Sequence, residues 1–115
     1  MRILLFCLLF YGTIAIAGSP FQKLAGLFHI SSAPQADLEE PLISNSHLYL
    51  SLSGDAAKST YEAMKIEPQI SYCGEDHFEK RAENFSCSFY FTKNVYECSF
   101  SIDINRGKLD LGGVC

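Results

Sequence analysis

The feature that most constrains the fold is a long alternation of apolar and polar residues near the end of the chain. The residues expected to face inward form two series, separated at Lys93-Asn94: Phe85, Cys87, Phe89 and Phe91, then Tyr96, Cys98, Phe100, Ile102 and Ile104. A period of two is typical of antiparallel strands with one buried face. Because Asn94 tolerates the left-handed conformation that a tight turn requires, the pattern predicts a β-hairpin.

The expected turns also set the register and, with it, the cysteine pairing. If Lys93-Asn94 is a two-residue loop, Cys87 and Cys98 are diagonal neighbours, too far apart to bridge easily. Closing the next turn symmetrically at residues 105–108 places Cys98 opposite Cys115, at a separation that suits a disulfide. Of the three connectivities that four cysteines allow, the sequence therefore predicts this one: Cys73–Cys87 and Cys98–Cys115.

A strand and a helix are expected before the hairpin. Residues 47–53 alternate, with three leucines on one side, as in a half-buried strand. An apolar stripe at helical spacing follows, made by Ala57, Thr60, Tyr61 and Met64. Ser53 or Asp55 can cap this helix, and Pro68 ends it. The predicted fold is α+β, with one strand and one short helix packed on an antiparallel meander of three to four strands, stapled by disulfides.

The N-terminal residues predict a protein that leaves the cytoplasm. Residues 1–17 have one positive charge, an apolar run and a small-residue cleavage site, so they are expected to be a signal peptide cut between Ala17 and Gly18. The run is too short for a membrane span, and we expect no stable membrane insertion after cleavage. Residues 18–46 are expected to be a flexible arm, in which Phe21, Leu24, Leu27 and Phe28 could line one helix face, and residues 47–115 a single α+β domain.

Composition narrows the class of partner. Without Arg2 the chain has 9 − 1 = 8 basic and 13 acidic residues, a net charge of −5, which excludes a general nucleic-acid-binding protein and suits a basic protein partner. The four remaining cysteines suit an oxidising compartment, periplasmic or extracellular. Signal peptide, size and cysteine number are similar to those of small exported bacterial proteins, including inhibitors of lysozyme-type enzymes and immunity proteins.

One group of ionisable residues stands out in the sequence. The sequence contains none of the common hydrolase, zinc or nucleotide motifs, and it predicts no cofactor and no metal site. Residues 74–79 place three carboxylates around His77, which is typical of a solvated acidic loop and, as the alternative, could form an acid/base cluster. His29 and His47 are expected at the surface. Asn84-Phe85-Ser86 matches the N-glycosylation pattern, although Phe85 is expected to be buried.

The outward face of the hairpin completes the functional prediction. In the expected register Tyr90 lies opposite Glu97 on a small polar surface, and tyrosine is common at binding hot spots. We therefore expect a small, non-catalytic protein-binding module, such as an inhibitor or immunity protein acting on a cell-envelope enzyme or toxin. Its expected contact residues are Tyr90, Glu97, Glu75, Asp76 and His77. The alternatives are a secreted toxin or hydrolase that uses loop 74–79, and a subunit of a surface assembly.

Overall fold

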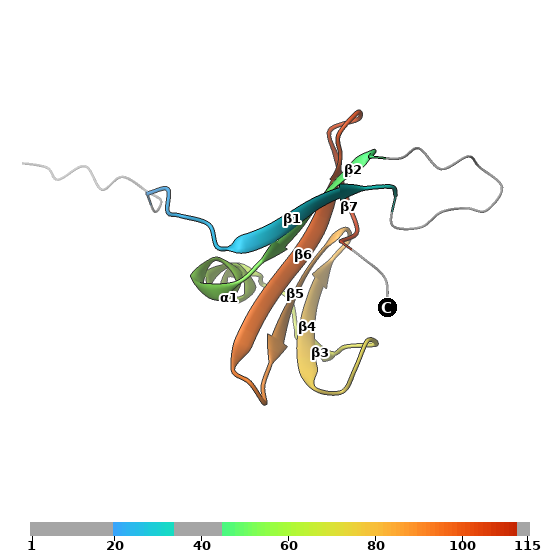
Figure 1. Cartoon of the computed structure of the whole chain (residues 1–115). Coiled ribbons are helices and arrows are strands. Elements are labelled where there is room, and N and C mark those ends of the chain that lie inside the picture. The colour runs from blue at the N-terminus through green and yellow to red at the C-terminus, as the bar shows by residue number, and fades with distance from the viewer. Residues whose placement is uncertain (1–19, 34–44, 113–115) are drawn as a thin grey trace, which may run out of the picture.

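The described residues form an antiparallel sheet with one short helix on one face (Figure 1). The computed structural model describes residues 20–33 and 45–112. Within these residues the elements are β1 (Gly26–Ser31), β2 (His47–Leu52), α1 (Gly54–Ala63), β3 (Gln69–Ile70), β4 (His77–Ala82), β5 (Phe85–Tyr90), β6 (Val95–Asp103) and β7 (Lys108–Asp110). The predicted α+β class is confirmed. The predicted signal peptide and its cleavage site lie outside the described residues.

The sheet has seven strands in the order β1-β2-β6-β5-β4-β3, and β7 pairs with the end of β6. Strand β6 is the centre, because β2 pairs along one of its edges while β5 and β7 share the other. The sheet is larger than the predicted one strand and meander of three to four strands. Two strands account for the difference: β1 lies in the expected arm, and β4 begins inside the expected loop 74–79.

Helix α1 packs on β5 and β6, as its apolar stripe predicts. Ala57 and Tyr61 are buried against Cys87 and Cys98, and these four residues are the core cluster of the described chain. Ser53 occupies the position before the helix, but its side chain makes no capping hydrogen bond. At the other end, the Lys80 ammonium donates to the carbonyl oxygens of Tyr61 and Met64, which stabilises the exposed end of the helix dipole.

The register of the β5–β6 hairpin changes the disulfide pairing. The turn contains four residues, Phe91–Asn94, so Tyr90 pairs with Val95, and Asn94 adopts the left-handed conformation with φ 54°. Cys87 is therefore directly opposite Cys98, and the two form a disulfide with their Cα atoms 4.0 Å apart. Both predicted pairs are therefore wrong: Cys73–Cys87 and Cys98–Cys115. The apolar alternation continues into the turn through Phe91, and for this reason it gave the wrong strand end.

The β6–β7 hairpin also differs from the expected register. Asp103 pairs with Lys108, which leaves residues 104–107 as the turn, and Gly107 supplies its left-handed residue with φ 66°. Ile102 consequently pairs with Leu109 rather than with Leu111. Cys73 is also disulfide-bonded, and Cys115 lies outside the described residues.

Strand β1 lies in the segment that was expected to be a flexible arm. It pairs along its whole length with β2, from Gly26 opposite Leu52 to Ser31 opposite His47. Leu27 and Phe28 therefore point to opposite faces of the sheet and do not share the helical face that their spacing suggested. Gly26 is needed for this pairing, because a Cβ at this position would collide with the carbonyl oxygen of Ser51.

Candidate functional site

The face of the sheet opposite the helix is polar, and it carries most of the predicted contact residues. We call this surface the polar face. In the row across β4, β5 and β6, Glu79 is opposite Ser88, which is opposite Glu97. In the next row, His77 is opposite Tyr90. The three strands β4, β5 and β6 thus bring together side chains that are far apart in the sequence.

An open cavity of about 200 Å³ lies on the polar face. Its chemically active lining residues are His77, Glu79, Arg81, Tyr90 and Glu97. Hydroxyl groups complete much of the wall, from Ser71, Ser86, Ser88 and Ser99. The lining can therefore accept and donate several hydrogen bonds, and it contains two carboxylates and one guanidinium group.

His77 is buried at the edge of this cavity, with 5% of its surface exposed. Its Nδ1 lies 2.8 Å from Oδ1 of Asp76, and its ring stacks on Tyr90 with the ring centres 4.5 Å apart. Because a carboxylate only accepts hydrogen bonds, Nδ1 carries the proton and Nε2 is the basic nitrogen of the neutral ring. Nε2 makes no hydrogen bond to any described residue.

The Tyr90 hydroxyl lies in a field of negative charge. Its pKa is raised, first by burial and then by the charges of Glu97, Asp76 and Glu79. The pKa of Asp76 is lowered, mainly by the hydrogen bond from His77 and also by the positive charge of Lys93. The protonated Tyr90 hydroxyl therefore keeps its donor, and the ionised carboxylates around it favour a positively charged ligand.

Glu79 and Arg81 form a fixed pair on the wall. Arg81 Nε donates to Glu79 Oε1 at 2.6 Å, and the Ser71 hydroxyl donates to Glu79 Oε2 at 2.9 Å. The side chain of Glu79 is 10% exposed and that of Arg81 49%. Glu97 accepts a longer bond, 3.2 Å, from the Ser51 hydroxyl. The Glu79 charge is thus largely neutralised by its partner, whereas Glu97 has only a hydroxyl donor among the described residues.

The structure brings together four of the five predicted contact residues. Tyr90, Glu97 and His77 line the cavity, and Asp76 holds His77. Glu75 is exposed in the preceding loop and makes no hydrogen bond or ion pair with the described residues. Arg81 was missed, although the alternation of His77, Glu79 and Arg81 is itself a strand pattern that places all three on one face.

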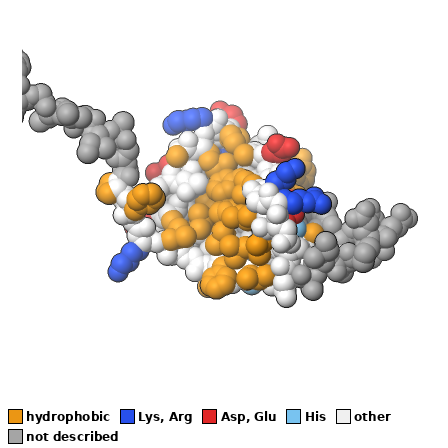
Figure 2. Space-filling model, turned by 90° about the horizontal axis from the view of Figure 1, so that it is seen from above, with side chains coloured by type: hydrophobic (Ala, Val, Ile, Leu, Met, Phe, Trp, Pro, Cys, Tyr) orange, Lys and Arg blue, Asp and Glu red, His pale blue; other side chains and the backbone are white. Residues whose placement is uncertain are grey.

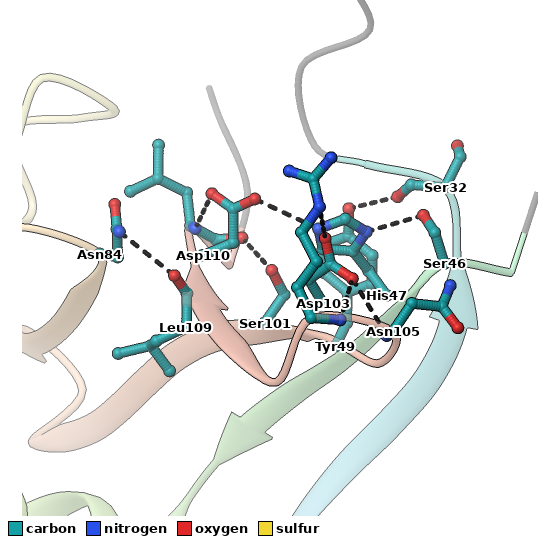
Figure 3. Close-up of polar contacts among 12 residues, drawn as sticks. Ser32, Ser46, His47, Tyr49, Asn84, Ser101, Asp103, Asn105, Leu109 and Asp110 are labelled. Carbon is teal, nitrogen blue, oxygen red and sulfur yellow. Dashed lines mark hydrogen bonds and ion pairs between the residues drawn. The ribbon is translucent and has the colours of Figure 1, made fainter. Parts of the chain in front are cut away.

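A second histidine, His47, lies on the same face near β7 (Figure 3). The expectation that it would be at the surface is wrong, because only 4% of it is exposed. Its Nδ1 lies 2.8 Å from the Ser46 hydroxyl, and its Nε2 lies 3.2 Å from Oδ2 of Asp110. Serine, histidine and aspartate also form nucleophilic triads, in which the serine contacts Nε2 and the carboxylate Nδ1; here the two partners are exchanged, and Ser46 is only 7% exposed. This cluster is suited to joining β2 to β7.

Neighbouring contacts strengthen this junction. The Tyr49 hydroxyl donates to the Ser32 carbonyl oxygen at 2.6 Å, and the Tyr49 ring stacks on His29. The half-buried Asn84 amide donates to the Leu109 carbonyl oxygen (Figure 3). Because this amide is the nitrogen that a glycan would modify, glycosylation at Asn84 would remove a contact between the β4–β5 turn and β7.

No protein-family model, curated protein or solved structure matches this chain. Across residues 20–33 and 45–112, no group of three or more histidine, cysteine, aspartate or glutamate side chains is arranged to hold a metal ion. The described helix is too short to cross a membrane. Function is therefore inferred from the chemistry of the polar face itself.

Proposed function

We propose that this protein is a small exported binding protein. Its polar-face cavity accepts a cationic side chain of a partner protein. The observation that carries the proposal is that Tyr90, His77 and Glu97, from three strands, line one cavity. An inhibitor or immunity protein directed at a cell-envelope enzyme or toxin could use such a cavity to bind its target. Such proteins act by presenting a rigid surface to their target, and the Cys87–Cys98 disulfide between β5 and β6 rigidifies this one.

The charges of the cavity support a lysine or arginine as the inserted group. The charges that raise the pKa of Tyr90 all belong to carboxylates. Glu97 is not paired with a described cation, and the net charge of the chain is −4. The stacked rings of Tyr90 and His77 add an aromatic surface for a guanidinium group. A cavity of about 200 Å³ has room for one long side chain and some water.

The test is selection of a random peptide library displayed on phage against the disulfide-bonded chain. We expect enrichment of peptides with arginine or lysine at one fixed position. Tyr90→Ala should weaken the binding of selected peptides by at least about tenfold, as for a hot-spot residue, and Glu97→Gln should weaken it to a similar extent. Glu62→Gln on α1 is the matched control and should leave binding unchanged, because Glu62 is exposed on the helix side.

Two outcomes would count against the proposal. One is selection of acidic or purely apolar peptides. The other is equal binding to the wild-type chain, to Tyr90→Ala and to Glu97→Gln.

The arrangement around His77 supports hydrolysis as a second candidate function. A histidine whose Nδ1 is held by a carboxylate has a basic Nε2, and here this nitrogen is free beside an open cavity. Such a group can take a proton from water or from a substrate hydroxyl. A hydrolase would lose its turnover in His77→Ala, whereas a binding protein has no turnover to lose. Purified chain that hydrolyses no ester, glycoside or phosphodiester substrate would exclude this candidate.

The disulfides support export of the chain. Cys87–Cys98 is formed, and Cys73 also takes part in a disulfide. Disulfides persist in periplasmic and extracellular proteins and are rare in the cytosol. Mass spectrometry of the natural product should find Gly18 as the first residue. An intact Met1, or free thiols at Cys87 and Cys98, would contradict the proposal.

A further inference from the structure

The two edges of the sheet are built differently, and the β1 edge lacks the features that protect a free strand. At the opposite edge, β3 has only two residues and follows Glu67 and Pro68. Strand β1 has six residues with no charged residue and no proline. Short length, charge and proline are the usual ways in which proteins prevent an edge strand from pairing with another chain. Within the described chain, no strand covers the outer edge of β1.

The side chains of β1 are apolar and exposed on both faces of the sheet. Leu27 is 79% exposed on the polar side, while Phe28 and Ile30 are 71% and 50% exposed on the helix side. Phe28 lies opposite Leu50 and Ile30 lies opposite Leu48, so they continue an apolar surface of the sheet that extends beyond the helix. Figure 2 shows hydrophobic side chains gathered in a continuous band across one face of the molecule. Exposed apolar surface of this kind marks an interaction site.

We propose that β1 pairs with β1 of a second copy of this chain, which makes a two-fold symmetric dimer with one continuous sheet. The strand is complementary to itself when two copies run antiparallel with Phe28 opposite Phe28. Gly26 then lies opposite Ile30, so a small residue meets a large one, and Leu27 lies opposite His29. Residues directly opposite each other point to the same face. Phe28 and Ile30 of both copies therefore lie together on the helix side, and Leu27 of each copy lies on the polar side.

The contacting strand itself adds no like-charge repulsion between two copies. The whole chain carries a net charge of −4, so two copies repel each other over most of their surface. Strand β1 has no acidic residue that would add to this repulsion. The surface of the dimer is separate from the polar face cavity, so the two proposals can fail independently.

The test is the molecular mass of the disulfide-bonded chain in solution, with a matched pair of variants. Ile30 on β1 and Ile70 on β3 are both 50% exposed, but they lie at opposite edges. We expect a dimer by sedimentation equilibrium. Ile30→Lys should raise its dissociation constant at least about tenfold, because a lysine on an edge strand opposes its pairing with another chain. Ile70→Lys should leave it unchanged.

A cross-link provides a second readout that does not depend on affinity. Phe28→Cys should form a disulfide between two copies under mild oxidation, because the two-fold axis places both cysteines opposite each other. Phe91→Cys, also exposed but in the β5–β6 turn, should not. A wild-type chain that sediments as a monomer at about 100 μM, a concentration well above that needed by a stable dimer, would overturn the proposal. A dimer that Ile30→Lys leaves intact, or that Phe28→Cys does not cross-link, would also overturn it.

Discussion

The two buried histidines of the polar face differ in what their ring nitrogens can do. His47 has both nitrogens occupied, one by its neighbour Ser46 and one by Asp110, 63 residues further along the chain. His77 has one nitrogen occupied, by the adjacent Asp76, and its other nitrogen is free of described partners beside an open cavity. Both rings pack on a tyrosine of the same face.

This difference separates a structural role from a binding role. A buried polar group with all of its hydrogen bonds made inside the protein stabilises the fold and has nothing to offer a ligand. A buried group with one position unfilled, among carboxylates and hydroxyls, is prepared for a ligand. We therefore expect His47 variants to affect stability and His77 variants to affect binding.

The largest effect on stability is expected from His47→Ala. The change removes a buried ring and leaves the Ser46 hydroxyl and Asp110 without their bond to it, so it should lower the free energy of unfolding by about 3 kcal/mol. Urea denaturation followed by circular dichroism measures this loss. His29→Ala, on the exposed side of the same ring stack, should cost less than about 1 kcal/mol. Equal losses of unfolding free energy in His47→Ala and His29→Ala would contradict the structural role assigned to His47.

His77→Ala should affect the binding of a ligand more than the stability of the fold. Its single local hydrogen bond and ring stack suggest a loss of about 1–2 kcal/mol in the free energy of unfolding, which leaves the chain folded. The affinity for cationic peptides should fall at least about tenfold, because the aromatic wall of the cavity is lost. Isothermal titration calorimetry at a temperature where the variant is fully folded measures this change. A variant that binds as well as the wild type would contradict the assigned role.

Asp76→Asn tests the hydrogen bond that orients His77. The folded-state pKa of Asp76 lies below its ordinary value of 3.8, so ionised Asp76 stabilises the folded chain at every pH above that value. This contribution is lost as the pH falls from 3.8 through the folded-state pKa. Melting temperatures of the wild type and the variant should therefore differ at pH 7 and converge below pH 4. A constant difference down to pH 2 would show that the charge of Asp76 is not involved.

The smallest effect is expected from Tyr90→Phe. The pKa of Tyr90 is raised above its ordinary value of 10.0, so this side chain ionises after the exposed tyrosines. An ultraviolet titration of the folded variant should lose one of the late-ionising groups. The pKa values of Tyr49 and Tyr61 are raised as well, mainly by burial, and their titration should persist. Loss of an early-ionising tyrosine instead would place the Tyr90 hydroxyl in water, outside the carboxylate cluster.

The elements with a strong local period could be predicted from the sequence. The stripe through Ala57 and Tyr61 determines the buried face of α1, and the alternation from residue 85 onward determines β5 and β6. Strand β4 was not predicted from the sequence. Its polar-face residues are all charged or ionisable, which is typical of a solvated loop: His77, Glu79 and Arg81. Strand β1 was not predicted because its apolar residues, taken together with the preceding Leu24, also have the spacing of a helix.

Contacts between distant segments could not be predicted in the same way. A shift of two residues in one turn decides whether Cys98 meets Cys87, and the alternation is the same in both registers. The bond between His47 and Asp110 depends on β2 and β7 lying on opposite sides of β6, which is a property of the whole sheet. The gathering of Tyr90, Glu97 and His77 could be foreseen in part, because an outward face was expected for two of the three.

The most direct test is a titration of the isotope-labelled chain with a short arginine-containing peptide, followed by proton–nitrogen correlation spectra. If the polar-face cavity accepts a cationic side chain, the amide signals that shift will cluster around Ser88, Tyr90 and Glu97 and will stop shifting in Glu97→Gln. If the signals do not move at saturating peptide, or if those that move belong to α1 or β1, the cavity is not the binding site.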